Sequence, residues 1–179
     1  YLSGTTKLWV ATTSIMTGEA RYFCVDDHNI HDVLTASCSI PLAYRDYPSV
    51  DNEPMSDGGI ADSIPVVEAY RRGARDITVV LSRPLGYEKK PLAFPALTRR
   101  MFREQPGLAE ALIHRGERYN ETLSFIQNPP DDCRLRIIAP PEDFPVSRLT
   151  TDLNKLDLGY QQGHRAAMAY LAELAQEVA

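Results

Sequence analysis

The sequence is poor in cysteine and has no long apolar run, and both features limit what the chain can be. Its 179 residues include three cysteines, Cys24, Cys38 and Cys133, and no Cys-x-x-Cys pair. An odd, widely spaced set argues against a disulfide framework, a zinc site or a redox dithiol, and it favours a reducing, cytoplasmic compartment. No uninterrupted apolar run approaches the roughly 18 residues that a membrane helix needs.

An excess of positive charge is also missing. The formal net charge is −5, so no global attraction to nucleic acid or to an anionic membrane is expected. With 44% hydrophobic and 24% charged residues, the composition is that of a globular domain. Because the first residue is Tyr1 and not Met, we expect the chain to be a piece of a longer protein.

Hydrophobic patterning predicts a mixture of strands and helices. Strands are expected around residues 8–13, 20–25, 77–81 and 135–139, and the first two form a hairpin whose turn contains Gly18. Helices are expected after Asp27 or Asn29, after Pro65, near residues 96–104, over 106–128 and along a closing apolar stripe from Tyr160 to Val178.

The order of these elements predicts an α/β fold with a mostly parallel sheet and flanking helices. A helix leads directly into residues 77–81, an apolar run without alternation, which is typical of a strand that is covered on both faces. Because four strands are few for a three-layer sheet, further strands are expected upstream of Tyr1.

The stretch EPMSDGGIADSIPV, residues 53–66, contains the strongest candidate for chemistry. Gly58 and Gly59 would let the backbone aim the carboxylate of Asp57 and let a substrate come close. A general base needs this arrangement, within hydrogen-bond reach of the proton it takes. The alternative is an Asp-Gly turn with a local structural role. A nucleophile is missing, because no Gly-x-Ser-x-Gly occurs, and Ser3 and Ser14 both lack glycines two residues away on either side.

Two sequence blocks resemble the second half of patatin-like phospholipases: ASCSIP at residues 36–41 and SDGGIADSIPV at 56–66. The opening LWVATTSIMTGEARYF and the closing LDLGYQQGHRAAMAYL are similar to that family as well. The resemblance implies a partial three-layer hydrolase domain over residues 1–179. It also implies a serine and aspartate dyad that hydrolyses acyl esters, chiefly of lipids, in which Asp57 is the base and no cofactor or metal takes part.

In that family the nucleophile and the oxyanion loop precede these blocks, so the isolated chain is expected to be inactive without the missing N-terminal segment. Its substrate would be a lipid or a small ester. Two alternatives remain open: a non-catalytic scaffold that keeps the fold, and a separate chain that completes a site with a partner. A triad using one of the four histidines is a further alternative to the dyad.

Other residues permit weaker hypotheses. His28 and His31, with Asp26, Asp27 and Asp32, resemble a metal cluster in composition, but acidic residues at a helix start are explained by the helix dipole. Cys38 has no cationic neighbour in sequence to activate it, and we interpret it as a small buried hydrophobe.

The proline-rich residues 83–106 form an irregular segment and a candidate lid. Arg99, Arg100 and Arg103 lie there beside Met101 and Phe102, a mixture that is also found in helices that contact a membrane surface. The preferred interpretation is a short helix packed on the core with its arginines in water, and peripheral membrane contact is the alternative.

Overall fold

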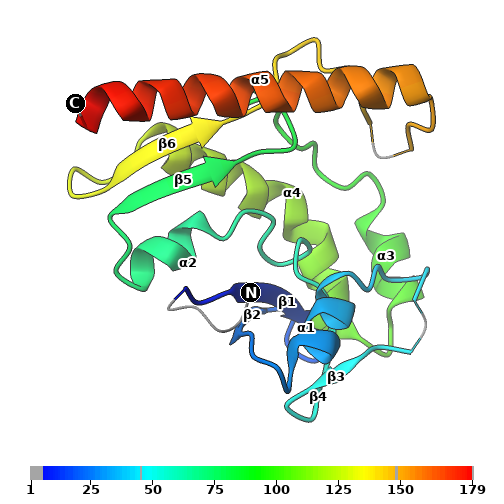
Figure 1. Ribbon diagram of the computed structural model, residues 1–179. Helices are drawn as coiled ribbons and strands as arrows, with labels where there is room; N and C mark the ends of the chain where they lie inside the picture. The colour runs from blue at the N-terminus through cyan, green and yellow to red at the C-terminus, as the bar shows by residue number, and fades with distance from the viewer. Residues whose placement is uncertain (1–5, 45, 148, 179) are drawn as a thin grey trace. The chain divides into compact units, whose positions relative to one another are not determined.

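The computed structural model describes residues 6–44, 46–147 and 149–178 (Figure 1). The chain divides into two compact units, which are described separately below. The first unit comprises Tyr1–Val67 and Glu88–Ser124, and the second comprises Glu68–Tyr87 and Phe125–Ala179. Within the described residues, no helix combines the length and the apolarity that crossing a membrane requires.

The first unit is built on a four-stranded antiparallel sheet in the order β2-β1-β4-β3. Its strands are β1 (Trp9–Ser14), β2 (Ala20–Cys24), β3 (Ser49–Val50) and β4 (Glu53–Asp57). The predicted hairpin is confirmed, since β1 pairs with β2 and Gly18 takes a φ of 73° in the turn. That positive φ is accessible to glycine without strain.

The prediction of a mostly parallel sheet with flanking helices is wrong. Helix α1 (Ile30–Ser37) and the short β3 follow β2 in the chain and precede β4. Strands β2 and β4 run in the same direction, because each is antiparallel to β1. However, β1 lies between them, so their hydrogen bonds are antiparallel. A strand-helix-strand order in the sequence does not reveal whether another strand is inserted between the two.

The β3–β4 hairpin was not predicted. Asp51 and Asn52 join the two strands with φ values of 50° and 62°, which is the pattern of a two-residue turn that favours Asp, Asn and Gly. Strand β4 includes Pro54, and proline lowers the expectation of a strand because it cannot donate to a ladder. The Asp-Asn pair was therefore the one available signal for this hairpin.

Two apolar clusters form the core of the first unit. One cluster joins Val33 and Ala36 of α1 to Met55 of β4 and to strand residues of β1 and β2. The other joins Ile15 and Ile60 to the start of helix α4 (Pro106–Gln127), where Leu108 is fully buried. Because strand β4, which ends at Asp57, contributes to one cluster and the residues after it contribute to the other, the turn at Asp57 is fixed between them.

Helix α4 reaches the sheet through a contact between two glycines. A Cβ built on Gly107 would lie 2.4 Å from the carbonyl oxygen of Met16, and one built on Gly18 would lie 2.1 Å from the oxygen of Gly107. Any side chain at either position would therefore separate the helix from the hairpin. Helix α3 (Pro95–Met101) precedes α4 and buries none of its own residues, although Phe102 directly after it enters the core.

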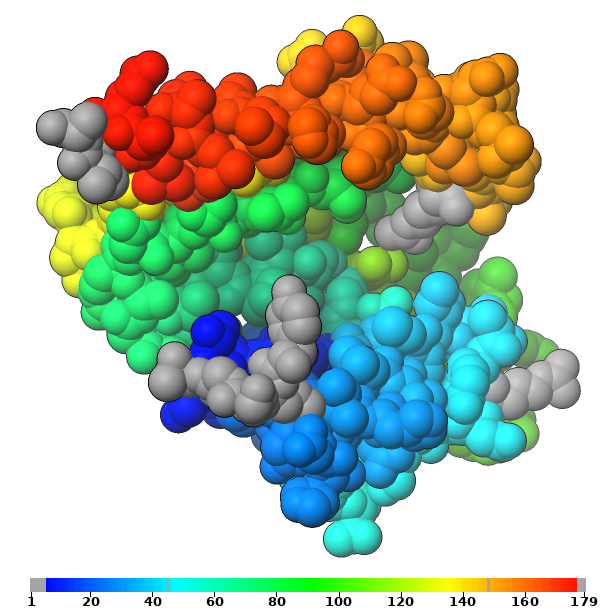
Figure 2. Space-filling model, viewed as in Figure 1, coloured from blue at the N-terminus to red at the C-terminus, as the bar shows by residue number. Residues whose placement is uncertain are grey.

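The second unit contains a pair of parallel strands. Strand β5 (Asp76–Val80) pairs in parallel with β6 (Arg134–Ile138), and α5 (Leu153–Val178) runs alongside them (Figure 1). The expectation that residues 77–81 are covered on both faces is wrong, because the Val80 side chain is 73% exposed. Atoms of α5 form a continuous ridge in Figure 2. Helix α2 (Val66–Arg71) spans the boundary between the units.

Candidate active site

Asp57 occupies the last position of β4, and its backbone is held on three sides. Its N–H donates to the carbonyl oxygen of Ser39 at 3.0 Å. Its own carbonyl oxygen accepts from the Thr13 hydroxyl at 2.8 Å and from the Ile60 N–H at 3.1 Å. Ser39 belongs to the ASCSIP block, so the structure brings the two sequence blocks into direct contact. The direction of the Asp57 side chain is thus determined by the backbone.

The two carboxylate oxygens of Asp57 have different surroundings. Its Oδ1 accepts the backbone N–H of Gly59 at 2.8 Å, which is the local turn that sequence analysis gave as the alternative interpretation. Its Oδ2 accepts no hydrogen bond from any residue that the structure describes. One oxygen is therefore used to fix the orientation of the group, and the other is left without a hydrogen-bond donor among the described residues.

Gly58 and Gly59 contribute to the turn in different ways. A Cβ on Gly58 would lie 2.1 Å from the carbonyl oxygen of Ala11, so only glycine allows the turn to pack on β1. A Cβ on Gly59 would lie 3.2 Å from Oδ1 of Asp57 and 3.5 Å from Nη2 of Arg115. Gly58 thus fixes the turn against the sheet, and Gly59 leaves space beside the carboxylate.

Thr12 is the strand partner of Asp57 and carries an unsatisfied polar group. The two residues are opposite each other in the β1–β4 register, so their side chains project from the same face of the sheet. The Thr12 side chain is fully buried, and its hydroxyl has no hydrogen-bond partner among the described residues. Such a group costs about 1–3 kcal/mol when it is left unpaired, so its presence requires an explanation.

Residues far apart in the sequence support the other side of the turn. The carbonyl oxygen of Gly59 accepts from Arg115 Nε at 2.7 Å and from the Ser63 hydroxyl at 2.7 Å. Lys89 Nζ donates to the same Ser63 hydroxyl at 3.0 Å. Arg115 and Lys89 were missed by sequence analysis. Arg115 lies 56 positions from Gly59, and no local pattern in the sequence connects them.

The histidines lie away from this arrangement. His28, His31, His114 and His164 are all exposed, and the hydrogen bonds and ion pairs of the first three involve neighbours on their own elements. Asp26 accepts the N–H groups of His28 and Asn29, so this carboxylate organises the start of α1. In the described part of the chain, no group of three or more metal-ligating side chains is assembled.

The structure also shows where Cys38 and Ser14 lie. Cys38 is exposed, so its interpretation as a buried hydrophobe is wrong. Ser14 is fully buried in β1, and its hydroxyl donates to the carboxylate of Glu53. Ser3 lies outside the described residues.

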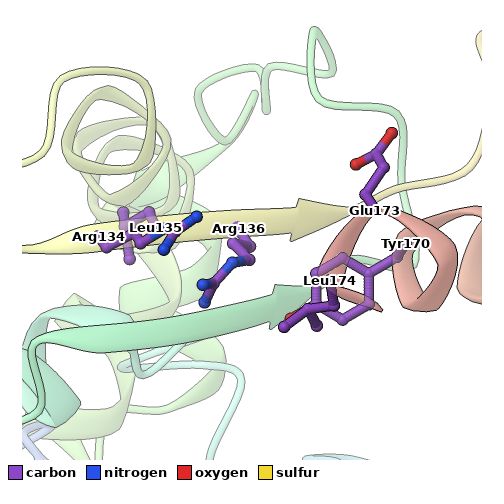
Figure 3. A pocket seen from close by; sticks show the side chains of 6 residues that line it. All are labelled: Arg134, Leu135, Arg136, Tyr170, Glu173 and Leu174. Carbon is purple, nitrogen blue, oxygen red and sulfur yellow. The ribbon is translucent and has the colours of Figure 1, made fainter. Parts of the chain in front are cut away.

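A separate depression lies in the second unit, between β6 and α5 (Figure 3). Its lining combines Arg134, Arg136 and Glu173 with apolar side chains and with Tyr170, whose hydroxyl is 2.6 Å from that of Thr78. Arg136 forms an ion pair with Asp76. None of the residues predicted to act in catalysis lines this depression.

Part of the chain matches a family of hydrolases. Residues 16–70 match the model of the patatin-like phospholipases, and this segment contains both sequence blocks together with Asp57. The resemblance is therefore confirmed over that segment, which is related to lipid hydrolases.

Residues 105–178 match a domain family of unknown function, DUF6363. The chain is also 32% identical over 154 residues to the uncharacterized protein YjjU of Escherichia coli (strain K12). That alignment covers 85% of this chain and 43% of the relative, so the chain spans less than half of the relative's length.

Proposed function

We propose that the intact protein containing this chain is an acyl-ester hydrolase that acts on lipids, and that Asp57 is its general base. The main support is the state of the Asp57 carboxylate, in which Oδ1 is fixed by Gly59 and Oδ2 accepts no bond from the described residues. The match of residues 16–70 to patatin-like phospholipases supplies the reaction class. In this proposal, the 179 residues are the C-terminal part of a single hydrolase domain.

In both acylation and deacylation, Asp57 accepts one proton and then gives it up. A serine hydroxyl from a segment outside this chain donates its proton to Oδ2 while its oxygen attacks the ester carbonyl carbon. The carbon–oxygen bond to the alcohol then breaks, and the alcohol leaves with that proton, which generates an acyl-enzyme. Asp57 next takes a proton from water, whose oxygen attacks the acyl carbon, and the proton returns to the serine as the acid departs.

The unpaired hydroxyl of Thr12 supports a binding role for this region. A buried donor without a partner is tolerated where another group occupies the site during function. Thr12 lies opposite Asp57 on the same face of the sheet, so a polar atom that approaches the carboxylate would also approach this hydroxyl. The exposed histidines have no contact that would place them between Asp57 and a serine, so a dyad accounts for the geometry better than a triad.

The experiment is an ester-hydrolysis assay on the intact protein with the substitution Asp57→Asn. Because general-base catalysis contributes typically 10²- to 10⁴-fold, kcat is expected to fall by roughly that factor with little change in thermal stability. Asp62→Asn is the matched control, since Asp62 follows in the same segment but accepts a hydrogen bond from Tyr22 at 2.5 Å. Unchanged hydrolysis in Asp57→Asn would refute the assignment of the base.

The same assay addresses the alternatives. If the intact protein hydrolyses no ester, a scaffold role replaces the hydrolase. The isolated 179-residue chain is expected to be inactive alone. If activity returns when a separately purified N-terminal fragment is added, the chain can complete a site with a partner. Substitution of each histidine by alanine should leave kcat within about threefold, whereas a triad predicts a loss comparable to that of Asp57→Asn.

We also propose that the segment around α3 contacts lipid surfaces from the aqueous side, consistent with a cytoplasmic, peripherally membrane-associated protein. Phe94, Leu97 and Met101 follow helical spacing and are 71%, 54% and 52% exposed. Arg99 forms two hydrogen bonds with Glu110 of α4, at 2.6 and 3.0 Å, and these hold α3 in place. Exposed apolar residues beside basic ones suit an interfacial helix.

The proposed lipid contact is tested by cosedimentation with vesicles that contain anionic lipid. Replacing Phe94 and Leu97 with serine should reduce the bound fraction. Leu171→Ser is the matched control, because Leu171 has a similar exposure of 55% but lies on α5. Equal retention of all three proteins would contradict the α3 contact.

Residues 83–106 stay a proposed lid. Within this segment Lys89 is anchored, because its backbone N–H and C=O both bond to the side chain of Asn120. Opening of the lid at Lys89 would have to break these two hydrogen bonds.

A further inference from the structure

Arg115 connects the two segments of the chain that match different families. It lies on α4, inside the segment that matches DUF6363, and its Nε donates to the carbonyl oxygen of Gly59 at 2.7 Å. Gly59 belongs to the segment that matches patatin-like phospholipases, and its N–H donates to Oδ1 of Asp57 at 2.8 Å. A single residue, Gly59, is therefore held by Arg115 at its carbonyl oxygen and bonds Asp57 through its N–H.

The geometry places the guanidinium close to the carboxylate as well as to the backbone. Arg115 Nη2 and Asp57 Oδ1 both lie within 3.5 Å of the position that a Cβ on Gly59 would occupy. The Ser63 hydroxyl donates to the carbonyl oxygen of Gly59 as well, so two donors fix the orientation of the Gly59–Ile60 peptide, which adjoins the peptide whose N–H bonds Asp57. Because glycine has the greatest backbone freedom of any residue, a catalytic turn that contains two glycines needs such external restraint.

Helix α4 is itself firmly placed, which makes it a suitable support. Its first turn contacts the β1–β2 hairpin through Gly107, and Leu108 and Ala111 are buried in the core of the first unit. Arg118, three residues after Arg115, donates to the carbonyl oxygen of Gly18 at 3.3 Å. A donor on a rigid helix holds its acceptor more accurately than one on a loop.

We propose that Arg115 is a positioning residue for the base, and that the DUF6363 segment supplies it as part of the active site. This inference rests on the proposed function, since it assumes that Asp57 takes a proton. Arg115 does not contact the ester in this proposal. It acts through Gly59: it holds the carbonyl of the Gly59–Ile60 peptide, and this restrains, through the Gly59 Cα, the preceding peptide whose N–H bonds Oδ1 and thereby directs Oδ2 toward the nucleophile.

The test is a double-mutant cycle in the intact protein with Arg115→Gln, Asp57→Asn and their combination, assayed on a fluorogenic acyl ester. Arg115→Gln should lower kcat by about 10- to 100-fold while KM changes less than threefold, because misplacement of a catalytic group by about 1 Å costs up to 10²-fold. In the Asp57→Asn background, Arg115→Gln should have no further effect, since residues that act as a unit are not additive. Arg115→Lys, which keeps the charge, should recover part of the loss.

Arg118→Gln is the matched control, because it also removes a bond from α4 to a backbone carbonyl of the first unit but leaves the Asp57 turn intact. It should leave kcat within about threefold, and circular dichroism and thermal unfolding should confirm that all variants fold. If Arg115→Gln does not fold, Arg115→Lys carries the same cycle: a smaller loss of kcat is expected, and it should again disappear in the Asp57→Asn background.

Two failures can be distinguished. If Asp57→Asn retains full activity, the proposed function fails and this inference fails with it. If Asp57→Asn is impaired while Arg115→Gln retains its kcat, or if the two effects multiply in the double variant, the general base stands and the positioning role of Arg115 is overturned.

Discussion

The two units bury different kinds of residue. In the first unit, Thr12, Thr13, Ser14 and Ser56 are completely buried in adjacent strands, and most of their hydroxyls bond to the backbone or to a carboxylate near the Asp57 turn. In the second unit, Val80 is the last residue of β5 in the parallel pair and is 73% exposed. In the first unit, buried polar side chains therefore hold a turn in place. In the second unit, an apolar residue at the end of a strand is exposed to solvent.

The comparison indicates that the backbone around Asp57 is the part of the chain whose orientation has to be held accurately. Hydrogen bonds from buried hydroxyls have defined directions, and they fix a backbone more tightly than apolar contacts do. A site that must hold one carboxylate oxygen in a defined direction benefits from such a framework. Exposed apolar residues on strands and helices, by contrast, are typical of surfaces that another segment covers. The following predictions test this difference between the units.

The largest effect is expected from a methyl group added at Gly58. In Gly58→Ala the new Cβ would lie 2.1 Å from the Ala11 carbonyl oxygen, so β1 and β4 would have to separate. The free energy of unfolding of the intact protein should fall by about 3 kcal/mol or more, as measured by urea denaturation. Gly163→Ala on α5 is the control, because nothing lies within 4 Å of its Cβ position, and it should stabilise by up to about 1 kcal/mol.

A second test compares leucines in the two units. Leu108→Ala should destabilise the intact protein by about 2–5 kcal/mol, because the side chain is fully buried and its removal leaves a cavity. Leu171→Ala should change the free energy of unfolding by less than about 0.5 kcal/mol, since Leu171 is 55% exposed. A loss at Leu171 similar to that at Leu108 would mean that the α5 face is covered in the intact protein, and the contrast between the units would not hold.

Elements with strong local signals were predicted well from the sequence. The strands around residues 8–13 and 20–25 correspond to β1 and β2, and the long helix over 106–128 corresponds to α4, because alternation, turn glycine and apolar spacing are local properties. The sheet order could not be predicted, since it depends on whether β1 lies between β2 and β4. That choice is made by tertiary contacts such as the Thr13 hydroxyl bond to the Asp57 carbonyl oxygen.

The residues of the Asp57 turn could be predicted from the sequence, but the residues that contact this turn from other elements could not. Asp57, Gly58 and Gly59 are adjacent in the sequence, so their shared turn could be read directly, and Asp57 stays a proposed base. Arg115 and Thr12 come from a different helix and a different strand. Their relation to Asp57 exists through the β1–β4 register and the packing of α4, which only the folded chain displays.

A smaller effect is expected from Thr12→Val, which replaces a buried, unpaired hydroxyl with a methyl group of similar size. Removing the unsatisfied group should raise the free energy of unfolding by about 1 kcal/mol, while ester hydrolysis by the intact protein should decline. Thr78→Val in the second unit is the control, because the Thr78 hydroxyl is paired with that of Tyr170. A destabilised Thr12→Val would show that the hydroxyl has a structural partner in the intact protein.

The smallest effect concerns two exposed carboxylates, one in each unit. The hydrogen bond from Arg99 lowers the pKa of Glu110 below its ordinary value, and the hydrogen bond from Tyr70, followed by the contribution of Arg75, lowers the pKa of Asp132. Since both pKa values are depressed in the folded protein, each contribution to stability is present at neutral pH and is lost as the pH falls through the folded pKa, below the ordinary carboxyl range. Carboxyl chemical shifts measured by NMR during an acid titration should show that the pKa values of Glu110 and Asp132 are both below their ordinary values. Arg99→Gln should return only Glu110 toward its ordinary value, and Arg75→Gln should do so only for Asp132. A single substitution that moved both titrations would show that the two carboxylates are electrostatically coupled, and the units could not then be treated as independent.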